Sequence, residues 1–305
     1  MRKIFLILSF STFVFLDFMP VISWACACGC GVFNVGTSSM FPSGQGGRVF
    51  TEYDFMDQNR NWSKDSKASA DGNSDKRIRT SFTDTGFQYM FNRKWGIQAD
   101  LPYDHRYFKA TDDAGGIVSF RHSAVGDMRI QGIYTGFSAD MSTGLEFGFK
   151  VPTGDWTYPN FDRDTELGTG STDALLGAYH RGAISASVGY FVQNLLDQPF
   201  LTQGGYRPGT EDDAVAGVDY NGLSAGSVRV TPIGEVENSY RSRDRGWAAN
   251  PADSGYERIL LAPGLELDYK RFMVFFDVGF PVYQHINGDQ LVAGSLYKVV
   301  VSYKF

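Results

Sequence analysis

Hydrophobic and polar residues alternate along much of this chain with a period of two. From Phe272 to Val282 every second residue is apolar, and the positions between them include Asp277. Successive side chains of a β-strand point to opposite faces, so this period predicts strands with one apolar face and one polar face. The same alternation recurs in residues 258–269, 142–151, 95–104 and 49–55, and it places Phe276 and Leu265 on the apolar face and Asp277 and Glu266 on the polar face.

The length of these segments distinguishes two kinds of all-β protein. A soluble β-sandwich also alternates, but its strands centre on about five or six residues. The segments here run to roughly 10–14 residues, which is enough to cross a bilayer at a tilt of about 45°. The sequence therefore predicts an all-β fold, a transmembrane antiparallel up-and-down β-barrel with a polar lumen and an apolar outer wall.

Short turns and longer polar loops alternate between the predicted strands. This rhythm predicts about twelve strands, with both ends of the barrel segment on the periplasmic side. The short turns are expected near residues 92–94, 137–141, 181–182, 231–232 and 270–271, and the longer loops near 57–76, 108–118, 152–170, 195–214, 242–255 and 287–293.

Both ends of the chain carry features of export and assembly. Arg2 and Lys3 precede an apolar run, and the small residue Ala25 follows it, which predicts a signal peptide over residues 1–25, with cleavage after Ala27 as the alternative. The last strand ends with Tyr303 and Phe305 on its apolar face. This ending resembles the signal by which outer-membrane barrels are recognised for insertion. We therefore expect export to the outer membrane of a Gram-negative bacterium.

This organisation defines three parts and the expected partners. The parts are a signal peptide (1–25), a Cys-containing periplasmic or plug segment (26–46) and an outer-membrane barrel (47–305). The partners are outer-membrane lipid, the insertion machinery and a small-molecule solute. The formal charge of −6 gives no indication of nucleic acid as a partner. The oligomeric state stays open.

Two short motifs surround the predicted loop at 152–170. The first reads K-V-P-T-G-D from Lys150 to Asp155, and the second reads L-G-T-G-S-T-D from Leu167 to Asp173. The pair resembles a loop of bacterial outer-membrane β-barrel proteins of the MetA-pathway of phenol degradation family. That resemblance implies a transporter-like channel for aromatic or other small compounds.

The motif residues suit a tightly folded loop. Pro152 fixes φ, Gly154 permits a tight turn, and Asp155 can accept hydrogen bonds from nearby backbone amides. Two interpretations stay open: the motifs fold this third loop, with an inward constriction as one form, or Asp155 or Asp173 contacts the solute. The candidate residues of this lumen or constriction loop are Pro152, Thr153, Gly154, Asp155, Gly168, Gly170, Ser171 and Asp173.

All three cysteines of the chain, Cys26, Cys28 and Cys30, fall within five residues. A C-x-C-x-C segment can present thiolates to a soft metal such as copper or zinc. The absence of a nearby His and of a fourth ligand weakens a zinc site. In an oxidising periplasm a Cys26–Cys30 disulfide is the structural alternative, and acylation or removal with the signal peptide is a third.

The lumen-facing positions carry charges of both signs. Mixed signs predict ion pairs across the lumen and a narrow or partly closed pore. The candidate lumen charges are Glu146, Lys150, Glu266, Asp268 and Asp277.

No enzymatic motif stands out. The four histidines are scattered singly, and the chain has neither a G-x-S-x-G elbow nor a phosphate-binding loop. A Ser and a His on the outer wall, as in barrel-embedded hydrolases, leave His122 with Ser123 or Ser119 as a minor alternative. We therefore expect a protein that is not an enzyme.

Two functions remain. The first is an outer-membrane channel for diffusion of a small solute, aromatic or otherwise hydrophobic. The second is a non-transporting structural or metal-handling barrel, whose Cys cluster binds a soft metal or docks a redox partner.

Overall fold

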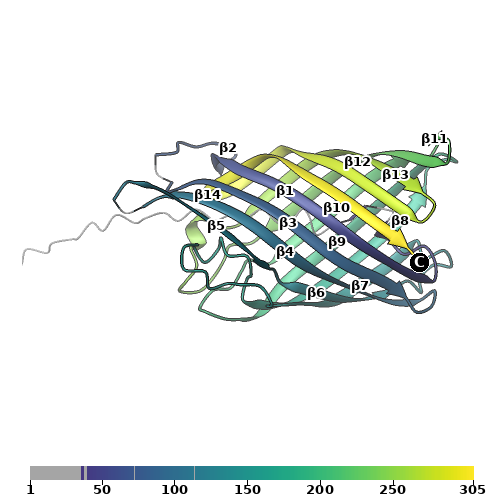
Figure 1. The fold of residues 1–305 in the computed structure, drawn as a ribbon, viewed down its shortest axis with the longest axis horizontal. Coiled ribbons are helices and arrows are strands. Elements are labelled where there is room, and N and C mark those ends of the chain that lie inside the picture. The colour runs from purple at the N-terminus through teal and green to yellow at the C-terminus, as the bar shows by residue number, and fades with distance from the viewer. Residues whose placement is uncertain (1–35, 38–39, 72, 113) are drawn as a thin grey trace, which may run out of the picture.

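The alternating segments form long antiparallel strands in the computed structural model, which describes residues 36–37, 40–71, 73–112 and 114–305. Eleven strands form a closed barrel and three further strands pair with it (Figure 1). The barrel strands are β1 (Gly46–Lys64), β3 (Asp75–Met90), β4 (Trp95–Thr111), β6 (Met128–Tyr134), β7 (Thr143–Val151), β8 (Ser171–Ala183), β9 (Val188–Thr202), β10 (Glu211–Tyr220), β12 (Val228–Arg241), β13 (Tyr256–Tyr269) and β14 (Phe272–Lys304); the others are β2 (Ser66–Lys67), β5 (Ile117–Val125) and β11 (Leu223–Ala225).

Two strand pairs close the sheet into a barrel: the first strand with the last, and β10 with β12. β1 pairs with β14 in a register that places Arg48 opposite Lys304, and β10 pairs with both β9 and β12. A closed sheet satisfies its backbone hydrogen bonds internally and leaves no open edge. Among the described residues, no helix is both long and apolar enough to cross a membrane.

The barrel has eleven strands, so the expected count of about twelve is not confirmed. β14 is 33 residues long; residues 272–286 of it pair with β13, and residues 286–304 pair with β1. The amide of Lys304 donates to the carbonyl of Arg271 at 2.9 Å, so the two ends of β14 lie side by side. The loop expected at 287–293 falls inside this continuous element.

Two predicted loops, at 152–170 and 242–255, lie where the sequence analysis expects them. β7 ends at Val151 and β8 begins at Ser171, while β12 ends at Arg241 and β13 begins at Tyr256, with the short 3-10 helix η3 (Pro251–Asp253) between them. The other loops are shorter than expected, because β1, β4 and β9 continue to Lys64, Thr111 and Thr202.

Two predicted turns are wrong. Residues 181–182 belong to β8, and residues 231–232 lie inside β12, where Pro232 pairs with Leu265 of β13. On the other side of β12, pairing with β10 ends at Ile233 and pairing with β11 begins at Val230. Pro232 therefore sits in a gap between two partners, where its missing N–H breaks no strand pair.

The wall of the barrel is apolar outside and polar inside. Phe276 and Leu265 are 45% and 39% exposed, whereas Asp277 and Glu266 are 3% and 4% exposed. This confirms the predicted register, since a shift by one residue would exchange the two faces.

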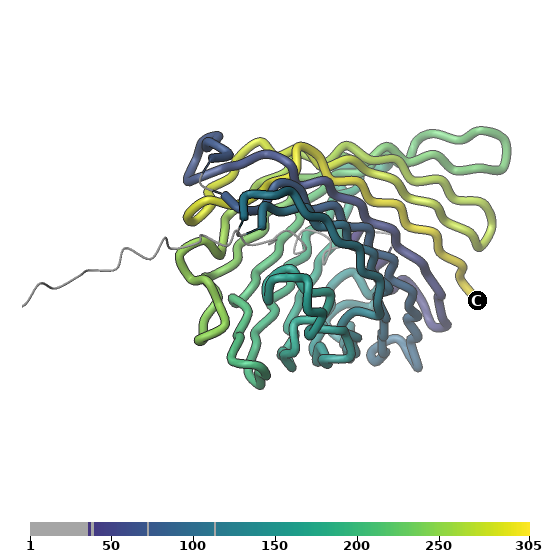
Figure 2. Tube along the Cα trace, turned by 60° about the vertical axis from the view of Figure 1, so that its left-hand side comes forward, coloured from purple at the N-terminus to yellow at the C-terminus, as the bar shows by residue number. Residues whose placement is uncertain are grey.

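The two ends of the barrel differ. Short turns and residue 305 lie at one end, at the right of Figure 1, while β2 and the longer connections lie at the other end. The tube in Figure 2 shows these longer connections gathered at the left of the view. We call these the turn end and the loop end.

Candidate functional site

The two sequence motifs meet inside the loop at 152–170. Gly154 and Gly168 pack backbone to backbone: a Cβ on Gly154 would lie 2.7 Å from the Cα of Gly168. The amide of Gly168 also donates to the carbonyl of Asp155 at 2.7 Å. Only glycines permit so close an approach, which explains why both motifs contain one.

A carboxylate of the barrel wall holds both motifs. Asp127 lies between β5 and β6, where one continuous strand would otherwise run. Its Oδ1 accepts from the amide of Gly154 at 3.0 Å, and its Oδ2 accepts from the amide and the hydroxyl of Thr169 at 2.8 and 2.6 Å. The interruption of the strand therefore provides the anchor of the loop.

Further contacts fix the loop over the lumen. The guanidinium of Arg106, on the inner face of β4, donates to the carbonyls of Thr165 and Glu166 at 2.5 and 3.0 Å. Phe161 packs edge-on against Phe108 with ring centroids 5.7 Å apart. The loop thus folds against the inner face of the barrel wall.

Asp155 is engaged within the protein. Its carboxylate lies 2.8 Å from Nε2 of His122, whose ring stacks on Tyr158 at 4.1 Å. Its other oxygen accepts from the amide and hydroxyl of Thr157, and these hydrogen bonds, together with His122, lower the pKa of Asp155. Asp155 therefore acts in the fold of the loop.

Two other carboxyl groups of the loop are shifted in the opposite direction. Burial raises the pKa of Glu166 to about 8 and the pKa of Asp162 to about 6. Desolvation disfavours the charged form of a carboxyl group, so these groups hold protons at pH values where free carboxyl groups do not.

An ion-pair cluster joins three neighbouring strands of the barrel wall below the loop. Lys150, at the start of the first motif, pairs with Asp173, at the end of the second, and lies 3.3 Å from Asp197 of β9. Lys150 and Asp173 are also direct partners in the β7–β8 register. Both acids and the lysine are buried, so this cluster ties three strands together at the base of the loop.

Two small adjoining cavities lie in the lumen, and a third hollow of about 410 Å³ lies at its turn end. The outer cavity, beneath the loop, has a volume of about 140 Å³, and the inner cavity, toward the turn end, has a volume of about 70 Å³. Asp84 and Arg129 line both of them, so the two cavities adjoin at this pair. Glu146 of the predicted lumen charges lines the inner cavity, and its carboxylate accepts from Nε2 of Gln193 at 3.0 Å.

Residues that precede β1 fill the inner half of the lumen. Phe41 is 2% exposed and stacks on Tyr179 with ring centroids 4.4 Å apart. The carbonyl of Met40 accepts from Gln88, and the amide of Gly36 donates to Gln193 at 2.9 Å. These residues line the inner cavity. We call residues 36–37 and 40–45 the lumen segment.

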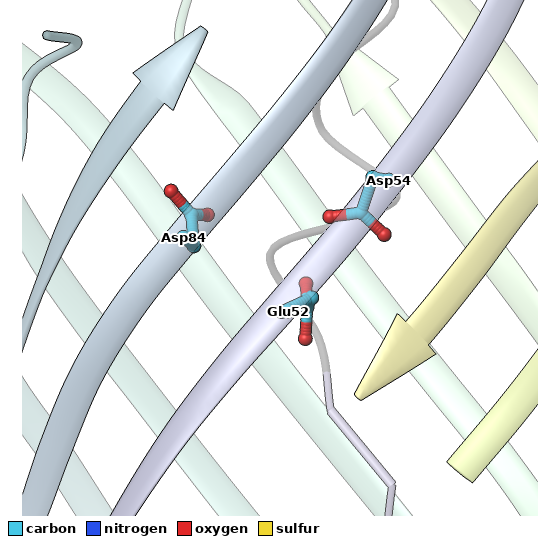
Figure 3. Close-up of side chains that lie close together, drawn as sticks. All are labelled: Glu52, Asp54 and Asp84. Atoms are coloured by element: carbon cyan, nitrogen blue, oxygen red, sulfur yellow. The ribbon is translucent and has the colours of Figure 1, made fainter. Parts of the chain in front are cut away.

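Three carboxylates gather on the inner wall beside the cavities. Glu52 and Asp54 of β1 and Asp84 of β3 place one oxygen each within 4.8 Å of the others (Figure 3). Oxygen ligands of this kind suit a hard cation such as Ca²⁺. Lys298 lies 3.9 Å from Glu52 and offsets part of this charge.

The other predicted site residues are dispersed. Asp268 pairs with Arg229 at 2.9 Å, and Tyr303 packs against Phe272 at 4.8 Å. Phe305 lies against Tyr89. Cys26, Cys28 and Cys30 lie outside the described residues, so metal ligation by them stays a prediction.

Sequence reasoning missed several lumen residues. Strand alternation marks Lys298 as a polar position of the last strand, but nothing in the sequence places it beside Glu52. The strand around Asp84 is rich in Thr and has no clear apolar face. The missed residues are Asp84, Arg106, Asp197, Lys298 and Phe41.

Comparison with known proteins identifies the fold. No family model matches the chain, and no curated protein matches it. The COG4313 outer membrane channel from Pseudomonas putida F1 matches in structure, with a TM-score of 0.65, 11% identity and coverage of 89% of this chain and 100% of that chain. The chain has the fold of an outer-membrane β-barrel. The β-domain of the Bordetella autotransporter Brka also matches, with a TM-score of 0.52, 10% identity and coverage of 86% and 100%.

These identities show the fold alone. The resemblance to the phenol-degradation family is not confirmed by a family model.

Proposed function

We propose that this protein is an outer-membrane channel for diffusion of a small solute in a Gram-negative bacterium. The observation that carries the proposal is the pair of adjoining cavities inside a charged lumen, enclosed by an apolar wall. An apolar exterior suits hydrocarbon, and a polar interior suits a solute path. The similarity to a protein described as an outer membrane channel supports the same function.

An outer-membrane location implies an export signal, an insertion signal and a number of membrane crossings. The signal peptide over residues 1–25 and recognition of the Tyr303 to Phe305 ending by insertion machinery belong to this proposal. In the same scheme β14 crosses the membrane twice, since its two halves pair with β13 and β1, and the barrel then has twelve crossings.

The solute we propose is a small aromatic or other hydrophobic compound. The outer cavity, at about 140 Å³, is close to the size of an apolar cavity of about 150 Å³ that accepts benzene. Phe82, Pro102 and Leu167 supply apolar lining beside the charged groups. A single ring with a polar substituent fits this mixture best, which agrees with the family that the loop motifs resemble.

A second candidate is a barrel that does not transport. The lumen segment favours it, because Phe41 and its neighbours occupy the inner half of the lumen. In that case the Cys cluster that precedes the segment binds a soft metal or docks a redox partner.

Solute flux into proteoliposomes separates the two candidates. We expect wild-type protein to admit a phenol-sized solute, and Phe41→Ala to admit it faster, because the stack that closes the inner cavity is lost. Phe276→Ala, which removes an equally large ring from the outer wall, is the matched control and should leave the flux unchanged. No flux through either wild-type protein or Phe41→Ala would exclude the channel.

A further inference from the structure

Basic side chains gather on the barrel near the loop ends of β3, β4 and β5. Arg77 and Arg79 belong to β3, and Arg121 belongs to β5. His105 and Tyr107 of β4 lie between them in the sheet: Arg79 pairs with Tyr107, and Tyr107 pairs with Arg121. We call these five residues the basic patch.

The basic patch faces outward. The alternate positions of the same strands, Ile78, Thr80, Arg106 and Phe108, are at most 3% exposed and point into the lumen. By the period of two, Arg77, Arg79 and their neighbours in register point to the outer surface. The patch is therefore separate from the lumen and from the proposed solute path.

Tyr107 orders the two arginines beside it. The guanidinium carbons of Arg121 and Arg79 lie 5.4 and 6.0 Å from the centre of its ring. A guanidinium group held over an aromatic face loses less freedom on binding an anion than a free side chain does. Together with Ser81, the patch residues line a hollow of about 340 Å³.

The positive charge of the patch is only partly offset. Asp57 of β1 accepts both guanidinium hydrogen bonds of Arg77 and lies 3.7 Å from Arg79. Within the described part of the chain it is the one carboxylate in ion-pair contact with these arginines. Arg121 and Arg79 thus keep charge available for an anion.

Height along the barrel places the patch at the edge of the apolar band. Trp95, near the turn end of β4, is followed on the same outer face by Ile97, Ala99, Leu101 and Tyr103, and then by His105. With a rise of about 3.4 Å per residue and a tilt of about 45°, the steps from Trp95 to His105 climb about 24 Å. The apolar band of such barrels is about 25 Å tall, so the patch begins where hydrocarbon ends.

We propose that the basic patch binds the phosphate groups of a lipid in the outer leaflet, which in this membrane is the phosphorylated lipid A. The inference rests on the proposed outer-membrane location, with the loop end outside. Arginine forks bind phosphate oxygens in pairs, and the hollow lies at the depth of the phosphates. The acyl chains then lie against the apolar residues below, such as Leu101 and Tyr103, which are 42% and 55% exposed.

A titration of the detergent-purified full chain with lipid A, followed by native mass spectrometry, tests the proposal. We expect bisphosphorylated lipid A to bind at least about tenfold more tightly than the same lipid without phosphates. The double variant Arg79→Gln/Arg121→Gln should lose this preference. Lys270→Gln/Arg271→Gln removes the same charge from an exposed turn at the other end of the barrel and should keep it.

Each arm has an outcome that overturns the proposal. Equal binding of the two lipids by wild-type protein would do so without any variant, and so would a phosphate preference that persists in Arg79→Gln/Arg121→Gln. Displacement of the lipid by an equal concentration of inorganic phosphate would show an anion site without a lipid. Since the assay needs only the folded barrel, its result is independent of solute flux, and heat-modifiable migration on gels verifies that each variant is folded.

Discussion

At the scale of single residues, the loop at 152–170 depends on positions where no side chain fits. Gly154 and Gly168 touch through their backbones, and Asp127 accepts hydrogen bonds from Gly154 and Thr169. The sequence motifs predicted a turn at Gly154. They did not predict the contact between the two glycines, because it depends on how β7 and β8 set the ends of the loop.

We expect Gly154→Ala to displace the loop. The new Cβ would lie 2.7 Å from the Cα of Gly168 and 2.9 Å from the carboxylate of Asp127, so the packing must open, at a cost of about 1–3 kcal/mol. Faster protease cleavage within residues 152–170 measures the change. Gly234→Ala is the control, since its Cβ would meet nothing within 4 Å. Equal cleavage of both variants would contradict the account of the loop.

At the scale of elements, the alternation of the sequence predicts the strands and their faces well. The β13 and β14 register places Leu265 opposite Phe276 outside the barrel, as expected from the sequence alone. The prediction fails where a local signal is overridden by pairing. Thr231 and Pro232 resemble a turn, but β12 continues through them because β13 pairs with it on one side.

The wall register leads to a prediction on stability. Phe276→Arg should lower the free energy of unfolding by about 2–4 kcal/mol, because it places a charge in hydrocarbon. Asp277→Asn should change stability little, because the side chain stays in the polar lumen. Urea unfolding in lipid vesicles measures both. The reverse order of the two effects would show that the faces are exchanged.

The buried carboxyl groups of the loop lead to a prediction on pH. Glu166 has a pKa raised to about 8 in the folded protein, from an ordinary value of 4.5. The protonated form of Glu166 stabilises the folded loop. This contribution is therefore complete below about pH 4.5 and is lost as the pH rises to about 8. Asp162, with a pKa of about 6, completes its own change earlier, and burial also raises the pKa of Asp164.

We therefore expect amide exchange in residues 152–170, corrected for its intrinsic pH dependence, to accelerate between about pH 6 and pH 8 in wild-type protein. Glu166→Gln cannot lose a proton and should show a weaker acceleration over this range. An identical pH dependence of the two proteins would remove Glu166 from the account.

At the scale of the whole molecule, the lumen is where sequence reasoning reaches its limit. The faces of the strands predicted which charges point inward, but not which of them meet. Lys150 of β7 contacts Asp197 of β9, which lies two strands away in the sheet. Phe41 reaches Tyr179 only because the chain before β1 enters the barrel. Such contacts depend on how the strands and the lumen segment come together in space, which no local pattern encodes.

More acidic than basic side chains line the assembled lumen. Carboxylates line both cavities, and a pore lined by carboxylates favours cations. The acidic residues that line the cavities include Asp54, Asp84, Asp104, Asp127, Asp173 and Asp197 in the outer one and Glu52, Asp84, Asp100 and Glu146 in the inner one, against Arg106, Arg129, Lys150, Arg163 and Arg241.

Single-channel recording in planar bilayers tests the central claim most directly, with the reversal potential measured across a KCl gradient. The account predicts discrete openings of small conductance, a reversal potential that shows preference for K⁺ over Cl⁻, and larger openings in Phe41→Ala. No openings in wild-type protein or in Phe41→Ala, or a preference for Cl⁻, would contradict a channel that runs through this acidic lumen.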